Sequence, residues 1–202
     1  MTKLEFFFDC SSPWTYLAFT NIQPLAARYG VEITWRPFLV GGVFNTINDS
    51  VYQSRQNPVP AKVAYGKKDM KDWARLAGIR ITHPPSIFPI NSVKAMRGCF
   101  VADEAGLLVP FSTRVFEAYW GDDENIAEDE VLARLCDDVG LDKSLFFDGI
   151  ALQEIKDRLR NNTQELIDRG GFGSPTIYIN ETDMYFGNDR LVLMEDALER
   201  LA

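Results

Sequence analysis

In the segment Phe6-Phe7-Phe8-Asp9-Cys10-Ser11-Ser12-Pro13-Trp14-Thr15-Tyr16-Leu17, an apolar run leads directly into a helix start, and the prediction of the fold depends on this junction. Residues 4–8 are mostly aromatic and apolar and contain no turn former, as in a buried strand. Ser12 supplies an N-cap hydroxyl and Pro13 suits the first helical position, so we predict a helix from about Pro13 to Arg28. The first N–H groups of a helix lack intrahelical partners and favour a bound anion, to which a serine hydroxyl can donate. The alternative is an ordinary capped helix that binds nothing.

Composition limits the classes of protein to consider. The chain has 202 residues, of which 46% are hydrophobic and 12% aromatic, enough for a well-packed core. No window approaches the roughly 18 apolar residues of a membrane span, and no signal-peptide pattern precedes the first strand. We therefore expect a soluble, cytoplasmic protein with no membrane partner. The formal net charge of −8 argues against non-specific binding of nucleic acid, so an anionic ligand would need specific lysine or arginine contacts.

Cysteine and histidine usage predicts no metal site and no disulfide. Cys10, Cys99 and Cys136 are an odd number at wide spacings, and Cys99 and Cys136 fall in helical apolar patterns typical of a core. His83 is the only histidine, so a histidine-based metal site or a Ser-His-Asp triad has no choice of imidazoles. Because threonine and two prolines flank His83, we expect it in a surface loop.

The order of predicted elements indicates the fold class. Gly30 ends the first helix, and residues 31–38 alternate as a second strand, which completes a β-α-β unit with a parallel, right-handed crossover. Residues 39–60 are rich in Gly, Asn, Asp, Ser and Pro and predict a long connection without helices. Further helices are predicted at 61–76, 92–105, 109–120, 128–139, 142–148 and 151–169, with a proline-rich loop over 79–90.

Strands return only near the end of the chain. Residues 175–179 and 184–186 predict a hairpin, followed by a closing helix from Asn188 or Asp189 to Leu201. The order β-α-β, helices, β-β-α is that of an α/β thioredoxin-like fold with an all-helical insertion between its two halves. The expected division is 1–60 and 171–202 for the thioredoxin-like domain and 61–170 for the helical domain.

Ser12-Pro13-Trp14-Thr15 occupies the place where a thioredoxin-type oxidoreductase has Cys-Pro-x-Cys, and both thiols are replaced. The segment 9–14 resembles the Asp-x-x-Ser-Pro start of one branch of the DsbA-like family, which holds 2-hydroxychromene-2-carboxylate isomerases and kappa-class glutathione transferases. Ser12, rather than Ser11, is then the counterpart of the active serine. Five further segments resemble the same branch in register, at residues 36–44, 59–62, 88–92, 171–176 and 186–191.

The resemblance implies a glutathione site. Ser12 would hydrogen-bond the glutathione sulfur and favour its thiolate, and a cis bond before Pro175 would present the backbone of Ser174 to the cysteinyl part. The residues implied for glutathione are Ser12, Asn48, Lys62, Ser174, Pro175, Asn188 and Asp189, with Asn45 and Asp49 as alternatives to Asn48. Without the resemblance, each reads as an ordinary cap, strand-entry proline or solvated charge.

The resemblance also implies an apolar pocket for an aromatic substrate. Its candidate residues are Trp14, Phe44, Phe88 and Trp120 as walls, with Asn91 and Arg190 as polar contacts. Each of these has core, cap or ion-pair roles as an alternative. Two departures from the pattern lie near the site, namely Asn45 in place of a lysine and Ser174 in place of valine or isoleucine.

The function implied is that of a glutathione-dependent isomerase, which converts 2-hydroxychromene-2-carboxylate or a related aromatic catabolite to the ring-opened trans-hydroxybenzylidenepyruvate by reversible thiolate addition. Two alternatives stay open: a kappa-type transferase that conjugates glutathione to electrophiles, and a non-catalytic module that binds a thiol or peptide. Family members are commonly homodimers, so a homodimer is expected, and disulfide oxidoreductase activity is not.

Overall fold

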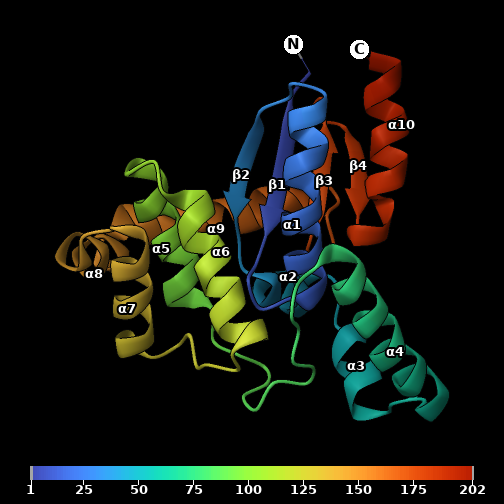
Figure 1. Ribbon diagram of the computed structural model, residues 1–202, viewed down its shortest axis with the longest axis horizontal. Coiled ribbons are helices and arrows are strands. Elements are labelled where there is room, and N and C mark those ends of the chain that lie inside the picture. Colours follow the sequence, from blue (N-terminus) through green and yellow to red (C-terminus); the bar gives the residue numbers. More distant parts are fainter. Residues whose placement is uncertain (1, 202) are drawn as a thin grey trace.

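The computed structural model describes residues 2–201 and contains a four-stranded sheet in the order β2-β1-β3-β4. Strand β1 (Leu4–Phe8) pairs in parallel with β2 (Ile33–Pro37) and antiparallel with β3 (Thr176–Ile179). Strand β4 (Asp183–Phe186) pairs antiparallel with β3 as a hairpin. The predicted β-α-β and β-β-α halves are therefore confirmed, and Figure 1 shows them joined in one sheet at the top of the molecule.

The alternation of side chains along β1 separates the core into two clusters. Phe6 and Phe8 belong to the larger cluster, which includes residues of α1 (Pro13–Arg28) and α10 (Leu191–Leu201). Phe7 points to the other face, where it packs with Tyr178 and residues of the helices that cover that side. A strand buried on both faces reads as a continuous apolar run, which is why residues 4–8 contain three consecutive phenylalanines.

Helix α1 has the bounds that the sequence predicts. The Ser12 side chain caps it by accepting from the Thr15 backbone N–H at 3.2 Å, and Pro13 is its first residue. At the other end Gly30 has φ +63, a left-handed conformation that glycine adopts without steric cost. Local signals therefore place the start of α1, the positive end of the helix dipole, shortly after β1.

The segment predicted as a long connection contains two short helices, so that prediction is wrong in this part. Helix α2 (Val40–Thr46) and helix α3 (Ser50–Gln56) precede α4 (Pro60–Ala77). Val40 and Val43 of α2 are buried in the smaller cluster, against Leu166. Tertiary packing overrides the weak helix propensity of Gly41-Gly42, which the sequence pattern alone does not reveal.

The remaining helices are α5 (Val93–Glu104), α6 (Leu108–Phe116), α7 (Asp129–Val139), α8 (Lys143–Ala151) and α9 (Gln153–Asp168). The predicted helix over 109–120 changes after α6 into a π-helical turn at Glu117–Gly121, and a 3₁₀ turn at Asn188–Arg190 precedes α10. As predicted, Cys99 and Cys136 are buried. Within residues 2–201, no helix is long and apolar enough to cross a membrane.

The helices between the two halves of the sheet lie in two places. In Figure 1, α5 to α8 lie on one side of the sheet and α3 with α4 on the other. The larger hydrophobic cluster runs from β1 and α1 into α5 to α9, so the sheet and these helices share a core. The division at residues 60 and 170 stays a prediction, and its outer bounds, residues 1 and 202, lie outside the described part of the chain.

Candidate active site

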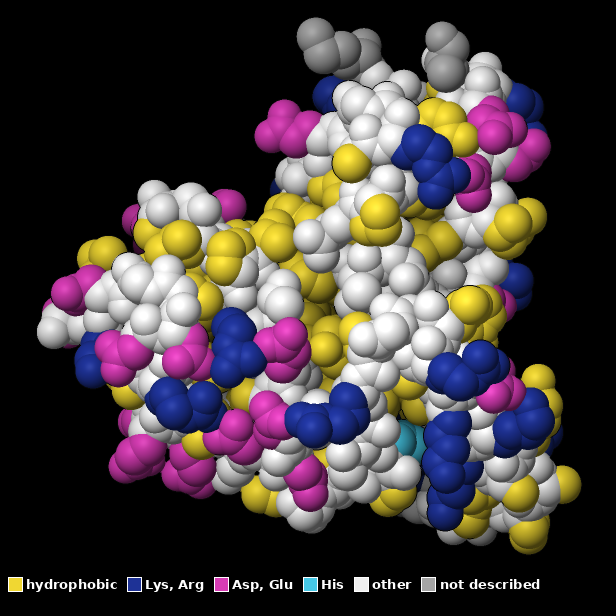
Figure 2. Space-filling model, viewed as in Figure 1, with side chains coloured by type: hydrophobic (Ala, Val, Ile, Leu, Met, Phe, Trp, Pro, Cys, Tyr) yellow, Lys and Arg dark blue, Asp and Glu magenta, His cyan; other side chains and the backbone are white. Residues whose placement is uncertain are grey.

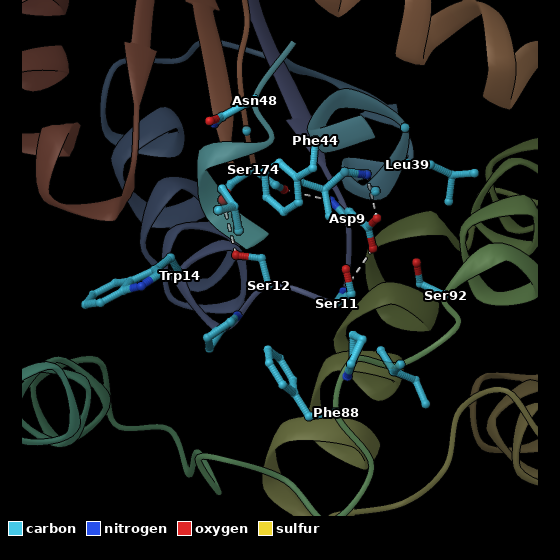
Figure 3. Close-up of a pocket in the computed structure, with 18 of the residues that line it drawn as sticks. Asp9, Ser11, Ser12, Trp14, Leu39, Phe44, Asn48, Phe88, Ser92 and Ser174 are labelled. Carbon is cyan, nitrogen blue, oxygen red and sulfur yellow. Dashed lines mark hydrogen bonds between the residues drawn. The ribbon is translucent and has the colours of Figure 1, made fainter. Parts of the chain in front are cut away.

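A cavity of about 820 Å³ lies beyond the end of β1. Its walls come from the turn before α1, from α2 and α3, from the loop before α5, and from the segment that leads into Pro175. Figure 3 shows Ser12, Trp14, Phe44, Phe88 and Ser174 arranged around it. Elements far apart in the sequence thus meet at the start of α1, where the sequence predicts an anion site.

Ser12 lies at the junction of this cavity with the segment before Pro175. Its hydroxyl donates to the backbone carbonyl of Ser174 at 3.1 Å and accepts from the Thr15 N–H. Pro13 has no N–H, and the N–H groups of Thr15 and Tyr16 donate to Ser12. The N–H of Trp14 is left without a partner in the described part of the chain. Negative charge on a bound group would therefore be favoured beside Ser12 by the helix dipole and by one rotatable donor.

The peptide bond between Ser174 and Pro175 is cis, as the resemblance implies. Ser174 is only 7% exposed, and its hydroxyl accepts from the Asp9 N–H at 3.0 Å and lies 2.7 Å from the Thr15 hydroxyl. Within residues 2–201 the backbone N–H of Ser174 has no hydrogen-bond partner. The segment is therefore fixed against β1 and α1 by its side chain, while its N–H stays free for a ligand backbone.

Asp9 is a site residue for which sequence reasoning proposed no role. It is 1% exposed and lines the large cavity, and its carboxylate oxygens accept from the N–H groups of Ser11 and Val40, both at 2.9 Å. Burial raises the pKa of the Asp9 carboxyl, and these hydrogen bonds together with one from Ser92 reduce that shift. Asp9 thus joins the Ser12 turn to the start of α2 (Figure 3). The sequence feature that could have identified Asp9 as a site residue is its position as an acidic residue directly after a buried strand.

Cys10 is not a reactive thiol. It is 1% exposed, and burial raises the pKa of its thiol further above the physiological range. Its carbonyl accepts from the indole N–H of Trp120 at 2.8 Å, and Trp120 is fully buried. Trp120 therefore belongs to the core, and its assignment as a cavity wall is wrong. Residues 2–201 contain no group of three His, Cys, Asp or Glu side chains that could hold a metal ion.

A second cavity of about 520 Å³ adjoins the first and shares Trp14, Ser174 and Phe186 with it. Asn188 and Asp189 line this second cavity. Asn188 is 3% exposed; its side-chain oxygen accepts from Asn21 at 2.9 Å, and its side-chain nitrogen is buried without a partner in the described chain. Buried polar groups are usually paired, so this orphaned donor fits a site for a polar ligand.

Two predicted contacts lie elsewhere. Lys62 is exposed on α4 and lines neither cavity. Arg190 lines only the second cavity, where it forms an ion pair with Asp189 at 3.2 Å, so it does not line the large cavity. The locations of Lys62 and Arg190 relative to the cavities depend on how the helices pack, and the local sequence motifs do not specify this packing.

Of the three alternatives Asn45, Asn48 and Asp49, only Asn48 lines the large cavity. Its side-chain nitrogen donates to the carbonyl of Phe172 at 2.9 Å. Asn45 accepts from the Tyr52 hydroxyl, and Asp49 precedes α3 as its N-cap residue without a side-chain cap. Contact of Asn48 with a ligand stays a prediction.

The large cavity brings together Trp14 of α1, Phe44 of α2, and Phe88 and Asn91 of the loop before α5. His83 also lines it and lies 6.3 Å from Phe88, ring centre to ring centre. As predicted, His83 lies in an exposed loop, and that loop forms part of the cavity wall. Burial lowers the pKa of the His83 imidazole, and the positive charge of Lys67 lowers it further. Tyr52 and Arg55 of α3 also line the cavity, and sequence reasoning missed them because α3 itself was not predicted.

Comparison with known proteins identifies relatives over nearly the full chain. The chain is 32% identical over 202 residues to a 2-hydroxychromene-2-carboxylate isomerase of Pseudomonas putida, covering 98% of this chain and 95% of the relative. It is 26% identical to glutathione S-transferase kappa 1 of Caenorhabditis elegans, covering 99% and 92%. A solved structure of 2-hydroxychromene-2-carboxylate isomerase superimposes with a TM-score of 0.83 at 28% identity, over 98% and 95% of the two chains. Residues 3–199 match the DSBA-like thioredoxin domain, and the chain therefore belongs to this family and has its thioredoxin-like fold.

Proposed function

We propose that the protein is a glutathione-dependent isomerase that converts 2-hydroxychromene-2-carboxylate, or a related aromatic carboxylate, to its ring-opened trans-hydroxybenzylidenepyruvate isomer. The observation that carries this proposal is the position of the Ser12 hydroxyl, 3.1 Å from the Ser174 carbonyl and facing a cavity of about 820 Å³. Similarity to isomerases over nearly the whole chain supports it. The fold alone would not support this proposal, because the same fold serves unrelated functions.

The residues between the two cavities fit glutathione. The free N–H of Ser174 can pair with a peptide backbone in the way that one strand pairs with another. The orphaned side-chain nitrogen of Asn188 and the adjacent first turn of the last helix suit the charged γ-glutamyl end. We place the tripeptide from Ser12 across Ser174 to Asn188 and Asp189.

Bound glutathione would supply a thiolate that adds reversibly to the conjugated system, so that a double bond becomes a single bond that can rotate. Ser12 keeps its proton and donates a hydrogen bond to sulfur, in place of the bond it makes to the Ser174 carbonyl. The N-terminus of α1 lowers the thiol pKa further. Ser12 is therefore a hydrogen-bond donor and is not the nucleophile.

The large cavity would hold the substrate. Trp14, Phe44 and Phe88 provide apolar and aromatic walls for a bicyclic ring system, and Asn91 provides a polar edge. Such walls exclude water from the reacting carbons and strengthen the interaction of Ser12 with developing charge.

Product analysis tests the proposal. The protein is incubated with glutathione and hydroxychromene carboxylate, and the products are separated and weighed by mass spectrometry. We expect a product of unchanged mass and complete recovery of glutathione. A kappa-type transferase, which the similarity to the Caenorhabditis elegans protein keeps as a second candidate, would instead accumulate a thioether. A binding module would give neither product.

Quaternary structure and location belong to the same proposal. We propose that the protein is a cytoplasmic homodimer. We also propose that it has no disulfide oxidoreductase activity, because Ser12 and Thr15 occupy the positions of the two redox cysteines and Cys10 is buried. Light scattering on the purified chain measures the mass of the assembly. An insulin-reduction assay measures oxidoreductase activity, which we expect to be absent.

A further inference from the structure

Arg55 is the one lysine or arginine side chain that lines the large cavity within residues 2–201. It lies on α3 and has no ion pair and no hydrogen bond in the described chain. Every other described arginine except Arg97 forms an ion pair with a carboxylate. Arg97 lines neither cavity. A cation in a cavity wall without an acidic partner is free to bind an anionic ligand.

The guanidinium of Arg55 lies over an aromatic wall of the cavity. Its central carbon is 5.0 Å from the ring centre of Phe88, which comes from the opposite loop. A cation over a ring face at this distance is attracted to the ring, and the planar guanidinium keeps its N–H groups available at its edge. Arg55 and Phe88 together therefore place a cation with hydrogen-bond donors beside an aromatic side chain in the cavity wall, an arrangement that suits an aromatic ring carrying a carboxylate.

The charge around Arg55 favours an anion although the whole chain is acidic. Between Ser50 and Ala77 the chain has six lysine or arginine residues and two aspartates, within a protein of formal net charge −8. Figure 2 shows basic side chains gathered beside the single histidine, at lower right, whereas acidic side chains gather at lower left. A local excess of positive charge raises the rate at which anions reach a cavity.

The acidic residue that lines the large cavity does not neutralise Arg55. Asp9 is 1% exposed, and its two carboxylate oxygens accept hydrogen bonds from the backbone at Ser11 and Val40. The predicted cation Arg190 lies on the second cavity and is paired with Asp189. Within the described chain, Arg55 is thus the arginine positioned for a ligand carboxylate in the large cavity.

We propose that Arg55 determines specificity by binding the carboxylate of a planar aromatic acid whose ring lies against Phe88. This inference rests on the proposed function for the identity of the substrate, but its chemistry requires only an aromatic carboxylate. The carboxylates of glutathione are a second source of the same chemistry, and they are excluded when loss of Arg55 leaves glutathione affinity unchanged.

The test measures binding in the absence of turnover. Chromone-2-carboxylate, a stable bicyclic acid, and its neutral carboxamide are titrated into the full-length protein by calorimetry. The variants are Arg55→Gln and Arg55→Lys, with Arg75→Gln as the matched control, since Arg75 is exposed on α4 and lines neither cavity. Glutathione is titrated separately into each protein.

We expect Arg55→Gln to weaken carboxylate binding by about 10- to 100-fold, the range of a hydrogen bond to a charged group, and to leave carboxamide and glutathione binding within about twofold. Arg55→Lys should keep part of the preference for the carboxylate over the carboxamide, and Arg75→Gln should keep all of it. Equal carboxylate affinity in the wild type and Arg55→Gln, no carboxylate binding by the wild type, or a matching loss of glutathione affinity would overturn the proposal. If the carboxylate preference depends on Arg55 but no isomerisation occurs, the proposed function fails and this inference stands.

Discussion

The hydroxyl of Ser12 donates to the carbonyl of Ser174 at 3.1 Å, across 162 positions of the sequence. The same hydroxyl caps α1 through the Thr15 N–H. This pair joins the β-α-β half of the fold to the segment before the cis proline. It places the Ser12 hydroxyl, the N-terminus of α1 and the free Ser174 N–H around one point. That point lies between the two cavities, where the proposed thiol would bind.

Ser12→Ala should raise the pKa of bound glutathione by about 1–2 units, because a hydrogen bond to a charged acceptor contributes roughly 1.5–3 kcal/mol. Ultraviolet absorbance of the thiolate, followed as pH changes, measures this. The substitution also removes a helix cap and should lower the free energy of unfolding by about 1 kcal/mol. Asp142→Ala removes the matching cap of α8, where Asp142 accepts from the Leu145 N–H, so it should cost similar stability and leave the thiol unchanged. An equal thiol pKa in wild type and Ser12→Ala would refute the assignment.

Asp9 should make stability depend on pH. Its pKa is raised in the folded protein, so from about pH 4 upward the folded chain binds more protons than the unfolded chain, and the free energy of unfolding falls as pH rises towards the raised value. Asp9→Asn removes this contribution. Urea denaturation between pH 4 and about pH 8 should show the wild type losing stability relative to Asp9→Asn as the pH rises. A difference that is constant over this range would contradict the raised pKa.

His83 should titrate below the ordinary histidine value of about 6.5, because burial and the charge of Lys67 both disfavour the imidazolium. The chain has one histidine, so a proton NMR titration follows a single imidazole. Lys67→Gln should move the pKa part of the way back, since the effect of burial persists. A wild-type pKa at or above 6.5 would show that the loop does not hold His83 against the cavity.

Packing of α5 against α8 should depend on Gly98. A Cβ atom there would lie 2.2 Å from a ring carbon of Phe146, which is fully buried. Gly98→Ala should therefore cost about 1–3 kcal/mol of stability through overpacking. Gly66→Ala is the control: its Cβ would meet nothing within 4 Å in α4, so a gain of about 0.5–1 kcal/mol is expected. Equal effects of the two substitutions on urea denaturation would mean that α5 and α8 are not in close contact.

The sequence was sufficient for the parts of the fold that local signals specify. The apolar run before Ser12-Pro13, the glycine at position 30 and the hairpin near the end each act within a few residues, and the structure confirms all three. Helix α2 was missed because Val40 and Val43 are held by contacts with α9, and such contacts are absent from a local pattern. Helix α3 was missed because it buries no residue and therefore shows no apolar periodicity.

Site residues could be predicted where a short sequence motif specifies their geometry. Residues whose place in the site depends on the packing of helices could not. Ser12 and Ser174 are brought together as the resemblance implies. Lys62 of α4 lines neither cavity, and Arg190, in the turn before α10, lines only the second cavity, so both stand apart from the large cavity. Arg55 was not predicted as a site residue, because its place in the cavity wall depends on how α3 packs near the loop that contains Phe88.

The initial rate of hydroxychromene carboxylate isomerisation, measured while glutathione is varied, tests whether glutathione is the catalytic thiol. We predict a rate that rises with glutathione to a plateau, with no glutathione consumed, and that falls strongly in Ser12→Ala. A wild-type rate that does not change when glutathione is omitted would show that the protein does not use glutathione for this reaction.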